Sequence, residues 1–151
     1  MHSALDMPIE EVDPKEILLN RFPMLFIDKF TQLNPGRSAC ATWHLTGDEW
    51  FFSGHFPGRP VVPGALVVEA IAQVAAVVML SHERGERRMW MLAGIDNCRF
   101  RHVVVPGDTL ESKLELTHFS AKSSKAIGEA SVGNELACHV ELLFVFPKDR
   151  S

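Results

Sequence analysis

Residues 51–73, which read FFSGHFPGRPVVPGALVVEAIAQ, decide the expected fold of this chain. The stretch begins with a segment rich in Gly and Pro and turns at Pro63-Gly64 into a mostly apolar run. Gly and Pro at this density indicate a loop, and the apolar run after them predicts a helix. The loop contains an imidazole, His55, and the helix contains a carboxylate, Glu69. Their polar side chains in a mostly apolar stretch make both residues candidates for function.

The predicted helix covers about residues 65–82 and is apolar on nearly every face. A helix with that pattern belongs inside a protein. A membrane span needs about 20 predominantly apolar residues, and Glu69 and Gln73 interrupt this run. We therefore expect a buried helix and no membrane partner.

Strand-like segments lie on both sides of this helix. Asn34-Pro35-Gly36 and Gly133-Asn134 are turn signals that predict hairpins, and residues 109–119 alternate polar and apolar side chains. We expect strands at residues 24–33, 37–45, 89–100, 109–119, 125–132 and 135–146. The pattern predicts one α+β domain over residues 1–151, with a curved antiparallel sheet wrapped around the helix.

The chain ends of this domain carry weaker signals. Residues 1–12 are expected to be a flexible tail, and Asp13-Pro14 predicts the start of a short helix because Asp caps free N–H groups. A single sheet leaves an unpaired edge and an uncovered part of its helix, so we also expect a dimer.

Composition excludes several classes of function. Of the 151 residues, 46% are hydrophobic and 23% are charged, which is typical of a globular domain. The formal net charge of −4 argues against nucleic acid as a partner, because phosphate binding needs a basic face. Cys40, Cys98 and Cys138 are far apart in the chain, which implies neither a disulfide framework nor a zinc site. The N-terminus lacks a signal-peptide pattern, so we expect a reduced, cytoplasmic location.

The central stretch contains the groups needed for acid–base chemistry. His55 is suited to accept a proton near neutral pH. Burial disfavours the charged form of a carboxylate, so Glu69 on an apolar helix is a candidate general acid. The first N–H groups of a helix lack intrahelical partners. Because Gly64 has no side chain, a substrate carbonyl could approach these groups, which would then act as an oxyanion hole. Together these groups suit removal of a proton and departure of a hydroxyl.

Each residue also has a simpler interpretation. His55 could be a loop histidine bonded to nearby backbone, and Pro63-Gly64 could be an ordinary helix start. Glu69 and Gln73 are four apart and share a helix face, which could be a solvated stripe. The remaining histidines show no metal-ligand spacing, so no metal site is expected.

The chain resembles the (3R)-hydroxyacyl-[acyl-carrier-protein] dehydratases of the FabZ type. Residues 51–73 are similar to the signature of that family, and residues 20–28, 97–101, 105–110 and 135–138 agree with other parts of it. The resemblance covers about residues 13–147.

The resemblance implies a hot-dog fold, a homodimer with its active sites at the interface, and, as a larger alternative, a trimer of dimers. His55 would be the base at C2, paired with Glu69 of the partner subunit, which would assist loss of the C3 hydroxyl. The Gly64 amide would bind the thioester carbonyl, and Gln73 would orient polar groups. Relatives that also isomerise their product usually have Asp at the position of Glu69, so Glu69 favours plain dehydration. No cofactor is implied.

The implied substrate is carried on acyl carrier protein and enters an apolar tunnel. Phe22 and Phe56 are the aromatic candidates for lining that tunnel. The family usually has His-Arg-Tyr-Pro where this chain has Asn-Arg-Phe-Pro at 20–23, so Phe22 keeps the ring and lacks the hydroxyl. Because the carrier protein is acidic, docking would need a basic patch on this chain. The candidate residues for that patch are Arg84, Arg87, Arg88, Arg99 and Arg101. The alternative is that these arginines are only part of a solvated surface.

Two other functions would fit the same fold. A hot-dog thioesterase would hydrolyse the thioester and release a free thiol. A non-catalytic binding or scaffold protein would bind the carrier protein without turnover.

Overall fold

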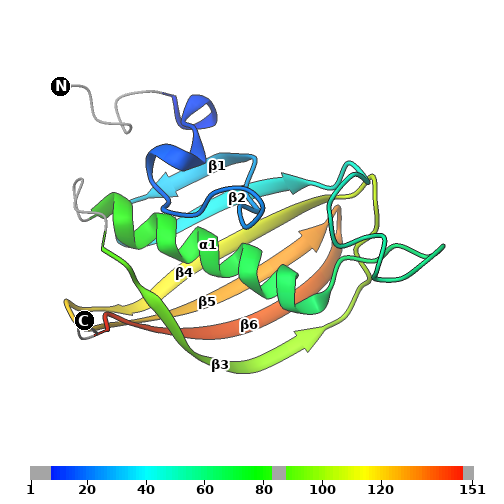
Figure 1. Ribbon diagram of the computed structural model, residues 1–151. Coiled ribbons are helices and arrows are strands. Elements are labelled where there is room, and N and C mark those ends of the chain that lie inside the picture. The colour runs from blue at the N-terminus through cyan, green and yellow to red at the C-terminus, as the bar shows by residue number, and fades with distance from the viewer. Residues whose placement is uncertain (1–7, 83–87, 148–151) are drawn as a thin grey trace.

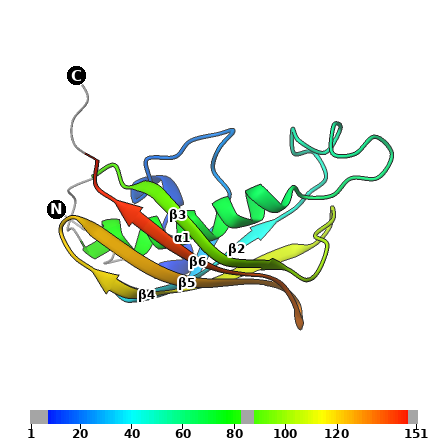
Figure 2. The same cartoon turned by 90° about the horizontal axis from the view of Figure 1, so that it is seen from below.

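The computed structural model describes residues 8–82 and 88–147. One long helix, α1 (Gly64–His82), lies across a six-stranded antiparallel sheet that curves around it (Figures 1 and 2). The strand order is β1-β2-β4-β5-β6-β3. The strands are β1 (Lys29–Asn34), β2 (Ser38–His44), β3 (Met91–Phe100), β4 (Thr109–Phe119), β5 (Ser123–Val132) and β6 (Glu135–Val145). This arrangement is the expected α+β hot-dog fold.

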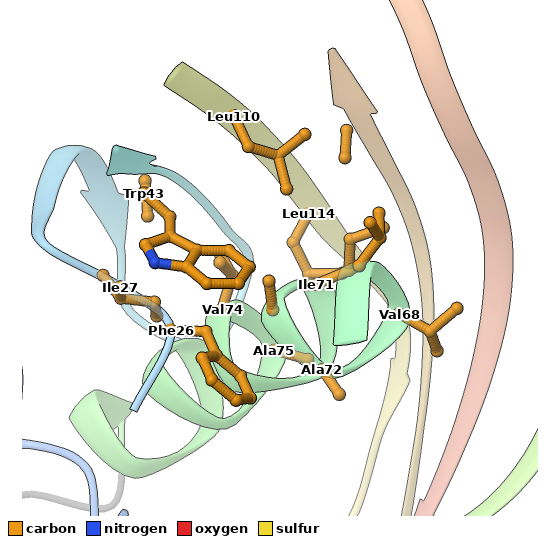
Figure 3. Close-up of a cluster of buried hydrophobic side chains, with 14 of the residues drawn as sticks. Phe26, Ile27, Trp43, Val68, Ile71, Ala72, Val74, Ala75, Leu110 and Leu114 are labelled. Carbon is orange, nitrogen blue, oxygen red and sulfur yellow. The ribbon is translucent and has the colours of Figure 1, made fainter. Parts of the chain in front are cut away.

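The helix α1 forms the centre of the hydrophobic core. Thirteen of its nineteen residues are buried, so it is enclosed on nearly every side, as its apolar pattern predicts. Its length and hydropathy would also suit a membrane span, but 72% of the qualifying window is buried within the protein. Figure 3 shows Ile71 of α1 beside Leu114 of β4, with Phe26 and Trp43 packed nearby. The helix is therefore the core helix of this domain.

One glycine lets the helix approach the sheet closely. A Cβ added to Gly128 of β5 would lie 2.3 Å from Ile71 Cγ2 and 3.2 Å from Leu114 Cδ2. Carbon atoms in contact are normally about 3.5–4.0 Å apart. The absent side chain of Gly128 is thus the space into which Ile71 packs.

The predicted hairpins form where the turn signals lie. Gly36 between β1 and β2 has φ of 75°, and Gly133 between β5 and β6 has φ of 58°. Both values lie in the left-handed region that glycine adopts without strain. The Gly36 N–H also donates to the Val78 carbonyl of α1 at 2.9 Å, which fastens this turn to the helix.

Several predicted boundaries differ from the structure. The first strand begins at Lys29 and not at residue 24, because the backbone at Met24 and Phe26 bonds to the Gln73 side chain. β3 starts two residues later than predicted, and β5 two residues earlier. Each strand boundary is set by where partner strands supply hydrogen bonds, which no single segment determines.

The N-terminal segment is more ordered than the sequence suggested. Within the expected tail, residues Ile9–Glu11 form a short 3₁₀ helix, η2, and Val12 is 2% exposed in the core. The helix start predicted at Asp13 is confirmed as another single 3₁₀ turn, η3 (Pro14–Glu16). Asp13 Oδ1 caps it by accepting from the Lys15 N–H at 2.9 Å.

β3 forms one edge of the sheet and pairs only with β6 within the described residues. Four of its large apolar side chains are between 38% and 54% exposed: Met91, Leu92, Ile95 and Phe100. A long edge strand with exposed apolar side chains is a template for pairing with another chain.

Candidate active site

His55 lies in the loop that leaves the sheet after β2 and projects past the N-terminal end of α1 (Figures 1 and 2). Its backbone carbonyl accepts from the Val61 N–H at 2.8 Å, and Phe56 and Arg59 exchange backbone hydrogen bonds at 3.0 and 2.9 Å. These bonds close the Gly- and Pro-rich segment on itself. The loop is therefore a defined scaffold for the imidazole.

The imidazole has a fixed orientation. His55 Nδ1 lies 2.9 Å from the Val61 carbonyl oxygen. Because a carbonyl can only accept, Nδ1 must carry the proton of this bond, and the neutral ring then presents Nε2 as its acceptor. The simpler interpretation, in which His55 bonds to nearby backbone, is therefore confirmed for this hydrogen bond. That bond also leaves Nε2 in the form that can remove a proton.

The N-terminus of α1 begins at Gly64. The Pro63 carbonyl accepts from the N–H groups of Leu66 and Val67 at 2.9 and 3.2 Å. The Gly64 N–H precedes these donors and belongs to the first-turn groups that a helix leaves without intrahelical partners. Such a group can donate to a ligand carbonyl at the positive end of the helix dipole.

Gly64 also has a packing role that the sequence did not reveal. A Cβ at this position would lie 3.0 Å from two ring atoms of Phe100, which comes from the end of β3. The glycine thus lets the Phe100 ring cover the start of the helix. Phe100 is 54% exposed, so the ring also faces the surface beside this site.

Glu69 and Gln73 are joined on one face of α1. Gln73 Nε2 donates to Glu69 Oε1 at 3.1 Å, as their spacing of four residues allows. Glu69 is half-buried, whereas Gln73 is 2% exposed. The alternative of a solvated stripe is therefore wrong for Gln73. Its carboxamide is part of the interior.

His55 and Glu69 are not joined within one chain. Among the described residues, no hydrogen bond or ion pair links the two side chains. His55 Nδ1 is engaged by Val61, and Glu69 Oε1 is engaged by Gln73. Within the described part of one chain, each of these two side chains thus bonds to its own neighbour and not to the other.

The two aromatic tunnel candidates lie on the surface of the single chain. Phe22 is 87% exposed and Phe56 is 53% exposed. The Phe56 ring stacks on the His55 ring with centroids 4.1 Å apart. Trp50 Nε1 donates to the Pro23 carbonyl at 3.1 Å, which ties the Phe22 segment to the loop that carries His55. The Phe56 ring thus contacts the histidine itself, whereas Phe22 is linked to the histidine loop only through the backbone of the next residue.

The arginine candidates separate into different groups. Arg84 and Arg87 lie outside the described residues. Arg88 is a structural residue, because its guanidinium lies 3.8 Å from the Phe146 ring centroid and donates to the Ala121 carbonyl at 2.7 Å. Arg99 and Arg101 are exposed on either side of Phe100 and remain available to a partner.

The cysteines are free thiols in the structure. Burial, followed by the neighbouring Cys98 thiol, raises the pKa of Cys138 to about 12. The described residues contain no group of three or more His, Cys, Asp or Glu side chains that could hold a metal ion.

Residue types predicted His55, Glu69 and Gln73 as candidates, but they did not indicate which backbone groups would bind these side chains. The partners are the Val61 and Met24 carbonyls and the Phe26 N–H. Backbone groups have no residue-type signal, so a sequence pattern cannot single them out.

Comparison with known proteins places the chain among dehydratases. A family model described as FabA-like domain matches residues 18–141. The 3-hydroxyacyl-[acyl-carrier-protein] dehydratase FabZ of Moorella thermoacetica is 45% identical over 85% of this chain and 90% of its own length. The same-named protein of Bacillus velezensis is 45% identical over 86% of this chain and 92% of its own length.

Solved structures of low sequence identity share the fold. The dehydratase heterocomplex ApeI:P from Xenorhabdus doucetiae has a TM-score of 0.75 at 19% identity, over 91% of this chain and 92% of that one. A hypothetical thioesterase with coenzyme A from Streptococcus pneumoniae has a TM-score of 0.63 at 11% identity, over 82% and 88%. At these identities the likeness concerns the fold alone. The match of the family model over most of the chain, together with relatives at 45% identity, shows that the chain belongs to the FabA-like domain family.

Proposed function

We propose that this protein removes water from (3R)-hydroxyacyl thioesters of acyl carrier protein and releases the trans-2-enoyl thioester, in fatty acid or related lipid or polyketide biosynthesis. The observation that carries the proposal is the hydrogen bond that orients the His55 ring, in a chain that belongs to this family. Its Nδ1 is held by the Val61 carbonyl, which leaves Nε2 as a base.

In the proposed reaction, His55 Nε2 takes a proton from C2 of the substrate. The thioester carbonyl accepts a hydrogen bond from the Gly64 N–H, which stabilises the negative charge that develops on its oxygen. The C2 electron pair forms the C2=C3 double bond as the C3–O bond breaks. Glu69 delivers a proton to the departing hydroxyl, directly or through a water, and one molecule of water leaves. The proton taken by His55 then returns to Glu69 through solvent, which restores both side chains, and none of these steps uses a cofactor.

We propose that the working unit is a homodimer that pairs through the β3 edge. The apolar side chains exposed on β3 would be buried there, and each site would combine His55 of one subunit with Glu69 of the partner subunit. Support comes from the lack of any bond between the two side chains within the described part of one chain. The alternative assembly is a trimer of such dimers, and the molecular mass in solution would distinguish it from a single dimer.

The proposed partner is acyl carrier protein in the cytoplasm. Arg99 and Arg101 are exposed next to Phe100 in the chain, and the Phe100 ring lies beside Gly64. A negatively charged carrier protein bound at these arginines would be near the end of β3, from which its substrate arm could reach the helix N-terminus. Phe22 and Phe56 are proposed to line the entry of the acyl tunnel. A basic patch of this kind sets the association rate, which predicts that carrier-protein binding weakens with salt.

The test is a turnover assay with a purified 3-hydroxyacyl-carrier-protein thioester, followed by mass spectrometry. We expect the native protein to produce a loss of one water and His55→Ala to produce almost none. Release of free thiol without water loss would identify a thioesterase, and binding without any reaction would identify a scaffold protein. Either result with folded protein would overturn the proposal.

A further inference from the structure

Cys98 and Cys138 are far apart in the chain, but the pairing of β3 with β6 brings them together. Phe100 of β3 lies opposite Cys138 of β6. Residues two apart on a strand point to the same face, so Cys98 shares the face of Phe100 and lies diagonally across from Cys138. This is the inner face of the sheet, because Cys138 is 0% exposed and Cys98 is half-buried against the core.

A β-bulge lies at Cys98. The register of β3 against β6 shifts between Asp96 and Arg99, so Asn97 and Cys98 together face a single residue of β6. Asn97 has φ of 49°, in the left-handed region that Asn adopts more readily than most residues. A bulge interrupts the ladder of strand hydrogen bonds. The backbone that carries Cys98 is therefore less constrained than the regular part of β3.

The two thiols contact each other in the structure. Burial raises the pKa of the Cys138 thiol to about 12, and charge repulsion from Cys98 and a hydrogen bond between the two thiols contribute to the same rise. Such a hydrogen bond requires the two sulfur atoms to be neighbours. Cys40 lies on β2, where its Sγ donates to Gln32 Oε1 at 3.6 Å. Within the described residues, Cys98 and Cys138 are thus the cysteines placed as a pair.

A bond between these sulfur atoms would move the end of β3. Diagonal neighbours on antiparallel strands are about 7–8 Å apart, whereas the Cα atoms of a disulfide are at most about 6.8 Å apart, so closure needs a shift of up to about 1 Å. The bulge can take up this shift. Phe100 is only two residues further along β3, and its ring lies 3.0 Å from the position of a Gly64 Cβ. The shift would therefore reach the ring that covers the start of α1.

From this geometry we propose that Cys98 and Cys138 are a redox-sensitive dithiol, which hydrogen peroxide closes into a disulfide, and that closure displaces Phe100 at the N-terminus of α1. The effect on the site rests on the proposed function. A disulfide that has to shift a strand is strained, and strained disulfides are readily reduced by thiols. Closure would therefore be reversible, as is usual for a disulfide in a reducing compartment.

The oxidation has two steps. The Cys98 sulfur, which is the more accessible of the two, attacks one oxygen of the peroxide. The O–O bond breaks, a sulfenic acid forms on Cys98, and the first water leaves. The Cys138 sulfur then attacks the Cys98 sulfur, the S–S bond forms as the S–O bond breaks, and the departing hydroxyl takes the Cys138 proton as a second water. The two thiols together lose two electrons, which the peroxide gains.

The test treats the reduced full-length protein with hydrogen peroxide and maps its peptides by mass spectrometry without reduction. We expect the mass of the chain to fall by two hydrogen atoms, the peptides with Cys98 and Cys138 to be linked, and dithiothreitol to reverse both changes. Cys98→Ala should abolish the link, whereas the matched control Cys40→Ala should retain it. Sulfinic acid on Cys98 without a link to Cys138, or a link between two chains on a non-reducing gel, would overturn the proposal.

Turnover in the water-loss assay tests the effect on the site. Oxidised native protein should be slower by roughly 10- to 100-fold, the scale of a displaced group at an active site, and dithiothreitol should restore the rate. Cys98→Ala should keep its rate after the same treatment. A mapped disulfide without any change in rate, or an equal loss of rate in Cys98→Ala, would overturn the effect on the site. No water loss by the reduced native protein would instead overturn the proposed function, while the mapped link would still support the dithiol.

Discussion

The contact between Gly128 and Ile71 gives the sharpest prediction for the fold. In Gly128→Ala the new Cβ would lie 2.3 Å from Ile71 Cγ2, at least about 1.2 Å closer than a normal carbon contact. Ile71 is 0% exposed, and it lies on α1 between Glu69 and Gln73. The helix must move or Ile71 must leave its preferred rotamer, and we expect a loss of about 1–3 kcal/mol in the free energy of unfolding.

The same contact predicts that the sign of this effect depends on Ile71. In an Ile71→Ala background the obstructing methyl group is absent, and Leu114 Cδ2, at 3.2 Å from the new Cβ, can move by a few tenths of an ångström into the cavity left behind. Gly128→Ala should then be neutral or should stabilise by up to about 1 kcal/mol, because glycine is unfavourable in a strand. Ile71→Ala by itself should cost about 2–5 kcal/mol. The two substitutions should therefore be strongly non-additive.

Urea unfolding at a fixed protein concentration measures this, since the stability of an oligomer depends on concentration. The midpoint should fall by roughly 1 M for Gly128→Ala, if the urea dependence is about 2 kcal/mol per M. Gly54→Ala is the control, because a Cβ there meets nothing within 4 Å. Equal effects of Gly128→Ala in both backgrounds would refute the packing argument.

Three further predictions concern the site and the thiols. His55→Ala and Glu69→Gln should each lower turnover by roughly 10²-fold or more in the water-loss assay, and near-normal rates in both folded variants would contradict their roles. Mixed dimers of His55→Ala and Glu69→Gln subunits should recover one active site, measured as turnover of a purified heterodimer; a verified heterodimer without activity would exclude a shared site. Because burial and the Cys98 thiol raise the pKa of Cys138 to about 12, the thiolate of Cys138 is almost absent below pH 9, and iodoacetamide should label it only after unfolding. Peptide mass spectrometry would detect the modification, and fast labelling of Cys138 in the native protein would contradict its burial.

Much of the fold follows from local patterns that tertiary contacts did not override. The helix was predicted to within one residue of its start because apolar residues surround its axis from residue 65 onwards. Residues 109–119 alternate in side-chain polarity and form β4 with those bounds, since alternation fixes both the strand and its buried face. The turn at Gly133-Asn134 was predicted because glycine there allows the backbone angle the hairpin needs.

The prediction failed where a side chain replaced a strand as hydrogen-bond partner. Residues 24–28 have the composition of a strand, yet the Phe26 N–H and the Met24 carbonyl bond to Gln73, 47 and 49 residues away. No local pattern encodes such a partner. Phe100 is a similar case. Its ring packs against Gly64, so a glycine is needed at residue 64 whether or not a substrate carbonyl binds there. Only the folded chain brings these two residues together.

The sequence by itself determined the α+β fold and the family, and it predicted which polar side chains form the candidate site, because residue type and spacing act locally. The tertiary structure decided how those side chains are held. It placed the Val61 carbonyl against His55 Nδ1, and it turned the Gln73 amide so that Glu69 Oε1 must accept. These orientations depend on backbone donors and acceptors, which every residue carries alike, so only the folding of the chain selects which of them reach the site.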